Sequence, residues 1–356
     1  MAALLVVLHH LGAAMASPKY FGASSFAVPF RSGDSGVEFF FVLSGFIITW
    51  VHYADFGKPA LLLTYFRKRA VRIYPTYWIV FMGVYLLALS SSTLRNSVPH
   101  DLSTVLKCLA LIPQDASVTG GTGALVLIVA WSLQYEICFY ILFALCIANR
   151  FLGMSIIVAL SLNMATCMGT TCSFPRSFLS SNLMLLFGIG ALVAYASKSS
   201  LRMARPLTLA VMSASAFLLF GAMETVLGQE TLWVDRRLIY GIFSAILILA
   251  LVRSEDSAQL RITNRWVSLL GDASFALYLV HFPLMNALCK LGIAVGLAGV
   301  AGAAIAYPLI LSACVAAALA FHLTVEKPML RALSPRLPRT PSTSGVALNA
   351  NRVLPS

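Results

Sequence analysis

The chain has 356 residues, of which 59% are hydrophobic and only 11% are charged, and its mean hydropathy is +0.86. Soluble domains are about one quarter charged, so this composition excludes an ordinary soluble protein and predicts an all-α, polytopic protein embedded in a lipid bilayer. The net charge of +12 does not indicate a nucleic-acid partner, because the basic residues lie in loops between apolar segments, where membrane topology explains them.

Apolar runs recur almost from end to end, and a spanning helix needs about 20 such residues. The pattern predicts about ten transmembrane helices, at roughly 1–16, 37–54, 73–91, 123–148, 151–169, 181–197, 207–226, 237–252, 267–289 and 297–321. With the N-terminus inside, the inner loops hold 17 of the 25 Lys and Arg residues, as the positive-inside rule expects. Both termini are therefore predicted to be cytoplasmic, with a membrane domain at 1–330 and a disordered basic tail at 331–356.

The first two predicted helices carry polar residues. His9 and His10 lie well inside the first apolar run. A histidine there is often only a hydrogen-bonded core residue, but it can also take a proton from an attacking hydroxyl near neutral pH. Glu38 opens the second helix, where the positive end of the helix dipole also favours a carboxylate. Ser44 and Gly45 lie further along and would let another backbone or a thin ligand approach closely.

A basic cluster, YFRKRAVRIYP, precedes the third predicted helix. Arg69 and Arg72 are three residues apart and would share one face if this segment is helical. A topology signal explains such a cluster by itself, and we accept that explanation for Lys58 and Lys68. Guanidinium groups on one face also suit bidentate contacts with phosphate, so the candidate phosphate-binding residues are Arg69 and Arg72, together with Arg67.

Later helices contain further buried polar candidates. Glu136 lies in AWSLQYEICFY, about thirteen residues from the outer end of its predicted helix. It would be roughly 20 Å deep, where an acid must be protonated, paired or facing a polar cavity. In LGDASFALYLVHFPLM, Tyr278 precedes His281 by one turn. The two residues could form a hydrogen-bonded pair in the core, or they could be functional. Cys167 and Cys172 lie near a predicted outer loop and could pair. The sequence predicts no metal site.

Four of these stretches, GVEFFFVLSGF, YFRKRAVRIYP, AWSLQYEICFY and LGDASFALYLVH, resemble the acyltransferase 3 family of integral-membrane acyltransferases in order and approximate spacing, over about residues 1–330. The WSLQYE form looks closest to the exopolysaccharide-acetylating branch, although the commoner form has a second acid where Ile137 stands. The resemblance implies a multi-pass protein of a bacterial cytoplasmic (inner) membrane. It also implies transfer of acyl, usually acetyl, groups from cytoplasmic acyl-CoA to hydroxyls on extracytoplasmic glycans or other acceptors. Acyl-CoA would be a co-substrate, and no permanently bound cofactor is expected.

The resemblance also carries residues across by position. His10 matches the family's first-helix histidine, which is thought to be the base, and Glu38 matches the acid of the second helix. Arg69 and Arg72 match the paired cytoplasmic arginines. The family's first helix has an arginine about three turns before its histidine, a position that would fall just before Met1. We therefore expect that the start was assigned at an internal methionine and that the first helix is short by several residues.

The expected reaction holds CoA phosphates on the arginines while His10 deprotonates the acceptor hydroxyl, which attacks the thioester carbonyl. A carboxylate would orient the imidazole, and the sequence leaves open whether Glu38 or Glu136 does so; Glu136 could instead bind the sugar. The acceptor also stays open among exopolysaccharide, lipopolysaccharide O-chain, another lipid-linked glycan, peptidoglycan and a small secreted molecule. The alternative function is a transporter or flippase for a lipid-linked glycan or small solute, because ionisable residues inside spans suit it equally well.

Overall fold

The computed structural model describes residues 2–199, 203–228, 235–257, 260 and 263–333. Every regular element within these residues is helical, so the predicted all-α class is confirmed. The predicted disordered tail at 331–356 lies outside the described residues from 334 onward, and its first three residues are helical instead. The α-helices are α1 (Ala2–Ala16), α2 (Gly36–His52), α3 (Leu62–Ser90), α4 (Leu102–Leu109), α5 (Ala116–Thr119), α6 (Trp131–Ala148), α7 (Arg150–Cys167), α8 (Arg176–Leu179), α9 (Asn182–Lys198), α10 (Pro206–Leu227), α11 (Arg236–Asp256), α12 (Arg265–Asp272), α13 (Ser274–Ala294), α14 (Gly299–Phe321) and α15 (Lys327–Leu333).

Nine helical segments in the described part of the chain are long and apolar enough to cross a membrane: Arg31–His52, Pro59–Ser90, Ile128–Ala148, Arg150–Cys167, Arg176–Lys198, Pro206–Leu227, Arg236–Asp256, Ser274–Ala294 and Gly299–Leu333. Helix α1 is also apolar but has only 15 residues. Together these ten segments correspond to the ten predicted ones, so the polytopic architecture is confirmed.

Several of the predicted helix boundaries were wrong. The ninth predicted helix is divided between α12 and α13. The basic cluster was expected in a loop, but it belongs to α3, which begins at Leu62 and continues through Pro75. The fourth predicted helix was expected to start at 123, but α6 begins only at Trp131. Gly123 has a φ of 79° and Leu127 is extended, so the apolar residues before α6 do not continue the helix towards the N-terminus.

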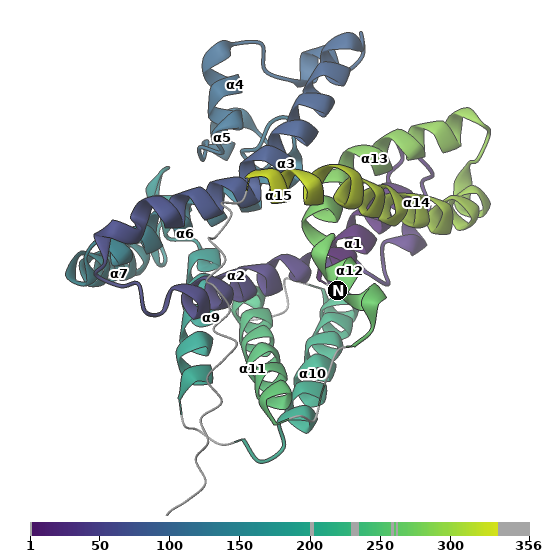
Figure 1. Ribbon diagram of the computed structural model, residues 1–356. Coiled ribbons are helices and arrows are strands. Elements are labelled where there is room, and N and C mark those ends of the chain that lie inside the picture. The colour runs from purple at the N-terminus through teal and green to yellow at the C-terminus, as the bar shows by residue number, and fades with distance from the viewer. Residues whose placement is uncertain (1, 200–202, 229–234, 258–259, 261–262, 334–356) are drawn as a thin grey trace, which may run out of the picture.

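Helix α2 runs through the middle of the molecule and contacts α1, α9 and α11 (Figure 1). In this view α9, α10 and α11 lie below α2, and α3 lies above it (Figure 1). Helices α13 and α14 pack side by side and both contact α1. The central position of α2 means that its opposite faces meet different helices.

Two glycines allow α2 and α9 to cross at very short range. A Cβ atom added to Gly45 would lie 2.1 Å from the carbonyl oxygen of Phe187, and one added to Gly190 would lie 2.0 Å from that of Val42. No side chain fits at either position, and small residues serve membrane helix interfaces in this way. The neighbouring Ser44 then lies towards α6, where its hydroxyl contacts a side chain of that helix.

Helix α7 lies at the periphery. Gly153 is the only buried residue among the described residues of α7, and the helix packs mainly against α6. Cys167 at its C-terminal end forms a disulfide with Cys172. The pairing that the sequence left open is therefore present.

Candidate functional site

A cavity of about 440 Å³ lies between α2, α3, α6 and α13. Much of its wall is apolar, with side chains such as Phe40, Ile48 and Phe275. Five of the residues singled out from the sequence lie in this wall, although they come from four helices: Ser44, Arg69, Arg72, Glu136 and Tyr278. The fold therefore collects polar groups that are far apart in the chain around one space.

Arg69 and Arg72 reach the cavity from the second and third turns of α3. Their spacing places both on one face of the helix, as expected. The Arg69 guanidinium carbon lies 5.7 Å from the ring centre of Tyr140, and that of Arg72 lies 5.7 Å from the ring centre of Phe275. Arg67 is exposed and is not in the cavity wall, because two residues along a helix turn a side chain to the opposite side. The structure does not bring Arg67 to this site.

Glu136 is held on the cavity wall by hydroxyl groups. The Tyr140 hydroxyl, one turn further along α6, donates a hydrogen bond to its Oε1, and the Ser44 hydroxyl donates to the same atom at 3.2 Å. Because α6 begins at Trp131, Glu136 is five residues into the helix, about 7.5 Å along its axis. The expected position about thirteen residues into the helix was wrong, because the residues before α6 do not continue that helix. Glu136 nevertheless lines the cavity, with its carboxylate hydrogen-bonded to two hydroxyl groups.

His10 and His281 form a pair beside this cavity. Nδ1 of His10 on α1 lies 3.0 Å from Nε2 of His281 on α13, and the two rings are stacked with centres 5.3 Å apart. His281 is fully buried, whereas His10 is half-buried. The adjacent His9 points elsewhere: its Nδ1 lies 2.9 Å from the carbonyl oxygen of Arg31. Only His10 of the two N-terminal histidines therefore belongs to the pair.

The hydrogen bonds define the tautomers of this pair when both rings are neutral. The Leu277 carbonyl oxygen lies 2.9 Å from Nδ1 of His281 and can only accept, so His281 carries its proton on Nδ1 and a lone pair on Nε2. His10 must then donate from Nδ1, which leaves its own lone pair on Nε2. The arrangement thus presents His10 as a base through Nε2.

Tyr278 lies in the cavity wall and packs against His281. Its hydroxyl donates to the carbonyl oxygen of Val129 at 3.0 Å and lies 2.7 Å from the hydroxyl of Ser132. The ring centres of Tyr278 and His281 are 6.0 Å apart, but within the described residues no hydrogen bond joins the Tyr278 hydroxyl to the His281 ring. The suggested tyrosine–histidine pair is therefore a packing contact.

Glu38 is buried at the N-terminal end of α2. Its Oε1 lies 3.9 Å from Nε of Arg237, and its Oε2 has no hydrogen-bond partner among the described residues. Within the described residues, neither Glu38 nor Glu136 makes a hydrogen bond to His10. The prediction that a carboxylate orients His10 was therefore wrong, because the ring of His281 occupies that place.

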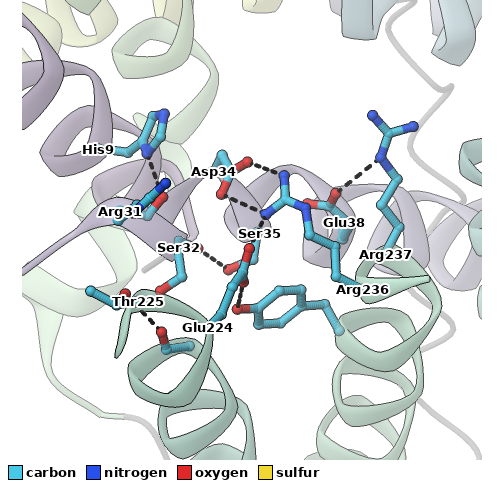
Figure 2. Close-up of polar contacts among 12 residues, drawn as sticks. His9, Arg31, Ser32, Asp34, Ser35, Glu38, Glu224, Thr225, Arg236 and Arg237 are labelled. Carbon is cyan, nitrogen blue, oxygen red and sulfur yellow. Dashed lines mark hydrogen bonds and ion pairs between the residues drawn. The ribbon is translucent and has the colours of Figure 1, made fainter. Parts of the chain in front are cut away.

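A second cluster of charges lies near Glu38, where the segment before α2 meets α10 and α11 (Figure 2). Arg236 points between two acids: its Nη2 lies 2.5 Å from Oδ2 of Asp34, and its Nη1 lies 2.8 Å from Oε1 of Glu224. The Tyr240 hydroxyl donates to the other Glu224 oxygen at 2.6 Å. These contacts join the two helices to the loop before α2.

The sequence interpretation missed Asp34, Glu224 and Arg236. Glu224 could have been found, because it is an acid inside a predicted span, and such a residue needs a partner. It is only 1% exposed, and its partner Arg236 lies beyond a connecting loop. No group of three or more His, Cys, Asp or Glu side chains in the described residues is arranged to bind a metal ion.

Comparisons with known proteins agree with this architecture. The family profile described as an acyltransferase domain matches residues 1–323. The chain is 26% identical over 324 residues to "Exopolysaccharide production protein ExoZ" of Rhizobium meliloti (strain 1021), covering 85% of this chain and 91% of that protein. It is 26% identical over 341 residues to "Acyltransferase MdmB" of Streptomyces mycarofaciens, covering 86% of this chain and 83% of that protein. No solved structure gives a significant match.

Proposed function

Because the chain belongs to the acyltransferase domain family, we propose that this membrane acyltransferase moves an acyl group, with acetyl as the first choice, from cytoplasmic acyl-CoA to a hydroxyl of an extracytoplasmic glycan. One observation carries the proposal: a single cavity has the two α3 arginines in its wall, and another wall residue, Tyr278, packs against His281, the hydrogen-bond partner of His10. Donor-binding groups and a base are thus close to the same space.

Arg69 and Arg72 are the proposed donor-binding residues. CoA carries several phosphates, and guanidinium groups bind phosphate through two parallel hydrogen bonds. With the phosphates on these arginines, the pantetheine arm would enter the cavity along α2 and bring the thioester towards Tyr278. Glu136, held by Ser44 and Tyr140, is assigned to substrate binding inside the cavity.

His10 is the proposed general base. Its Nε2 accepts the proton of the acceptor hydroxyl while the hydroxyl oxygen attacks the thioester carbonyl carbon. The C–O bond forms and the C–S bond breaks, and the CoA thiolate takes the proton from the His10 imidazolium. His281 accepts the hydrogen bond from Nδ1 throughout, which holds Nε2 in position for the acceptor.

With the N-terminus in the cytoplasm, as the loop charges predict, Arg69 and Arg72 would lie on the inner side of a bacterial cytoplasmic membrane and Glu38 on its outer side. The excess of Lys and Arg in the predicted inner loops supports it. The Cys167–Cys172 disulfide supports it as well, because it lies at the end of α7 that this topology places outside, where disulfides persist.

The transporter or flippase alternative is disfavoured by the family and by the similarity to a protein named as an acyltransferase. For the acceptor, the similarity to an exopolysaccharide production protein makes an exopolysaccharide or its lipid-linked precursor our first choice. Lipopolysaccharide and small secreted molecules are the next candidates.

The experiment is transfer of labelled acetyl from acetyl-CoA to a glycan by the purified protein in liposomes. We expect label on the glycan with the wild-type protein and none with His10→Ala. His100→Ala is the matched control, because His100 is exposed and contacts only a loop carbonyl in the described structure. Solute movement without any dependence on acyl-CoA would overturn the proposed function.

A further inference from the structure

Arg69 meets a histidine that the proposed reaction does not use. His52 is the last residue of α2, is only 4% exposed, and has its Nε2 3.2 Å from Nη2 of Arg69. Its Nδ1 lies 2.7 Å from Oδ2 of Asp55, three residues further along the chain. Asp55, His52 and Arg69 therefore form a continuous chain of hydrogen bonds between the end of α2 and the start of α3.

The chemistry of these three groups fixes the direction of both hydrogen bonds. A guanidinium group has only donors, so Nε2 of His52 must accept. His52 is then neutral with its proton on Nδ1, and this proton is donated to the Asp55 carboxylate. Asp55 thus selects the tautomer of His52 that can hold Arg69.

Aromatic rings restrict the Arg69 side chain further. Its guanidinium carbon lies 5.9 Å from the ring centre of Tyr65 and 5.7 Å from that of Tyr140. The His52 ring also packs edge-on against Tyr65, with centres 5.0 Å apart. By contrast, Arg72 packs against the ring of Phe275 and makes no hydrogen bond to the described residues. Arg69 is therefore the better-fixed of the two arginines.

One donor of Arg69 is left without a partner. Its Nε is buried and makes no hydrogen bond within the described residues, although Arg69 lines the cavity. A buried donor without an acceptor is costly, so this arginine is not placed here for stability alone. The guanidinium is thus held on one side by His52, while Arg69 still forms part of the cavity wall.

We propose that His52 and Asp55 are positioning residues that hold Arg69 in the orientation needed to bind a phosphate of the acyl donor. This inference rests on the proposed function, in which Arg69 binds that donor. Because the two residues act through Arg69 on donor binding alone, their loss raises the donor KM and leaves kcat and the acceptor KM unchanged.

The first test compares two replacements of His52. His52→Leu removes the acceptor, whereas His52→Gln keeps an acceptor oxygen near the position of Nε2. We expect His52→Leu to raise the donor KM by about 10- to 100-fold, the range for one hydrogen bond to a charged group. His52→Gln is expected to stay within about threefold of the wild-type protein, since its acceptor is retained. Equal losses in both variants would overturn the inference, because packing alone would then explain them.

The second test asks whether His52 acts through Arg69. In a double-mutant cycle, His52→Leu should add little to the loss caused by Arg69→Ala, because the group it positions is already gone. Asp55→Ala should weaken donor binding more than Asp55→Asn, which keeps an acceptor for Nδ1–H. Full additivity of His52→Leu and Arg69→Ala would contradict the positioning role.

Binding of desulfo-CoA, which has the phosphates but no thiol, gives a readout that is independent of catalysis. In nanodiscs we expect wild-type protein and His52→Gln to bind it with similar Kd and His52→Leu to bind it about 10- to 100-fold more weakly. If the wild-type protein does not bind desulfo-CoA, the proposed function fails and the inference with it. If the wild-type protein binds and His52→Leu binds equally well, only the inference fails.

Discussion

Nδ1 of His10 lies 3.0 Å from Nε2 of His281, although the two residues are 271 positions apart in the chain. A neutral imidazole thus takes the place that a carboxylate often has beside a catalytic histidine. It fixes the tautomer and direction of His10, but it offers no negative charge to the imidazolium that forms during the reaction. His281 is therefore expected to act mainly by orientation.

Replacement of His281 should lower kcat more when the new side chain cannot accept the hydrogen bond from Nδ1 of His10. We expect His281→Leu to reduce kcat by about 100-fold or more, because His10 loses its orienting partner and general-base catalysis is worth about that much. His281→Gln, which can accept the Nδ1–H bond, should lose about tenfold or less. Initial rates at saturating donor and acceptor measure both. A rate for His281→Leu equal to that of the wild-type protein would rule out this role.

The two cavity arginines and the exposed one should behave differently. Arg69→Ala and Arg72→Ala are each expected to raise the donor KM by about 10- to 100-fold, since each removes hydrogen bonds to phosphate. Arg67→Ala should change the donor KM by less than about threefold, because a solvated side chain outside the cavity contributes little. Titration of the donor at fixed acceptor concentration measures the difference. Similar losses for all three would show that the whole cluster binds the donor.

The crossing of α2 and α9 should not tolerate a methyl group. Gly45→Ala and Gly190→Ala are expected to lower the free energy of unfolding by about 1–3 kcal/mol or more, because the added Cβ meets backbone atoms. Gly188→Ala on the same helix is the matched control, since an added Cβ there meets nothing within 4 Å. Thermal unfolding in detergent compares them. Equal stability of all three variants would contradict the close crossing.

Replacing each of the two adjacent arginines at the start of α11 should lower the free energy of unfolding by different amounts. Arg236→Met leaves the buried Glu224 without its ion pair, and we expect a loss of about 3 kcal/mol in the free energy of unfolding. Arg237→Met should cost less than about 1 kcal/mol, because its side chain is 43% exposed and lies 3.9 Å from Glu38. Denaturant titration in mixed micelles measures both. A larger loss of stability for Arg237→Met than for Arg236→Met would instead show that the ion pair between Arg237 and Glu38 contributes more than that between Arg236 and Glu224.

Local patterns predicted much of the site. The common face of Arg69 and Arg72 follows from a spacing of three residues within one helix, and the structure places both in one cavity wall. The position of Glu136 along its helix could not be predicted in the same way. Hydropathy does not distinguish an apolar helix from the apolar, glycine-containing segment before Trp131, so counting from 123 gave the wrong position.

The sequence by itself determined that the chain is a helical, multi-pass membrane protein, because runs of apolar residues of spanning length can be accommodated in a bilayer only as helices with internally satisfied backbones. Only the tertiary structure decided which polar residues meet. His10 pairs with His281 instead of Glu38, and Arg69 pairs with His52, because contacts between helices depend on their crossing and rotation. In a membrane these are set by short-range packing, such as Gly45 against Phe187, and no periodicity within a single helix encodes them.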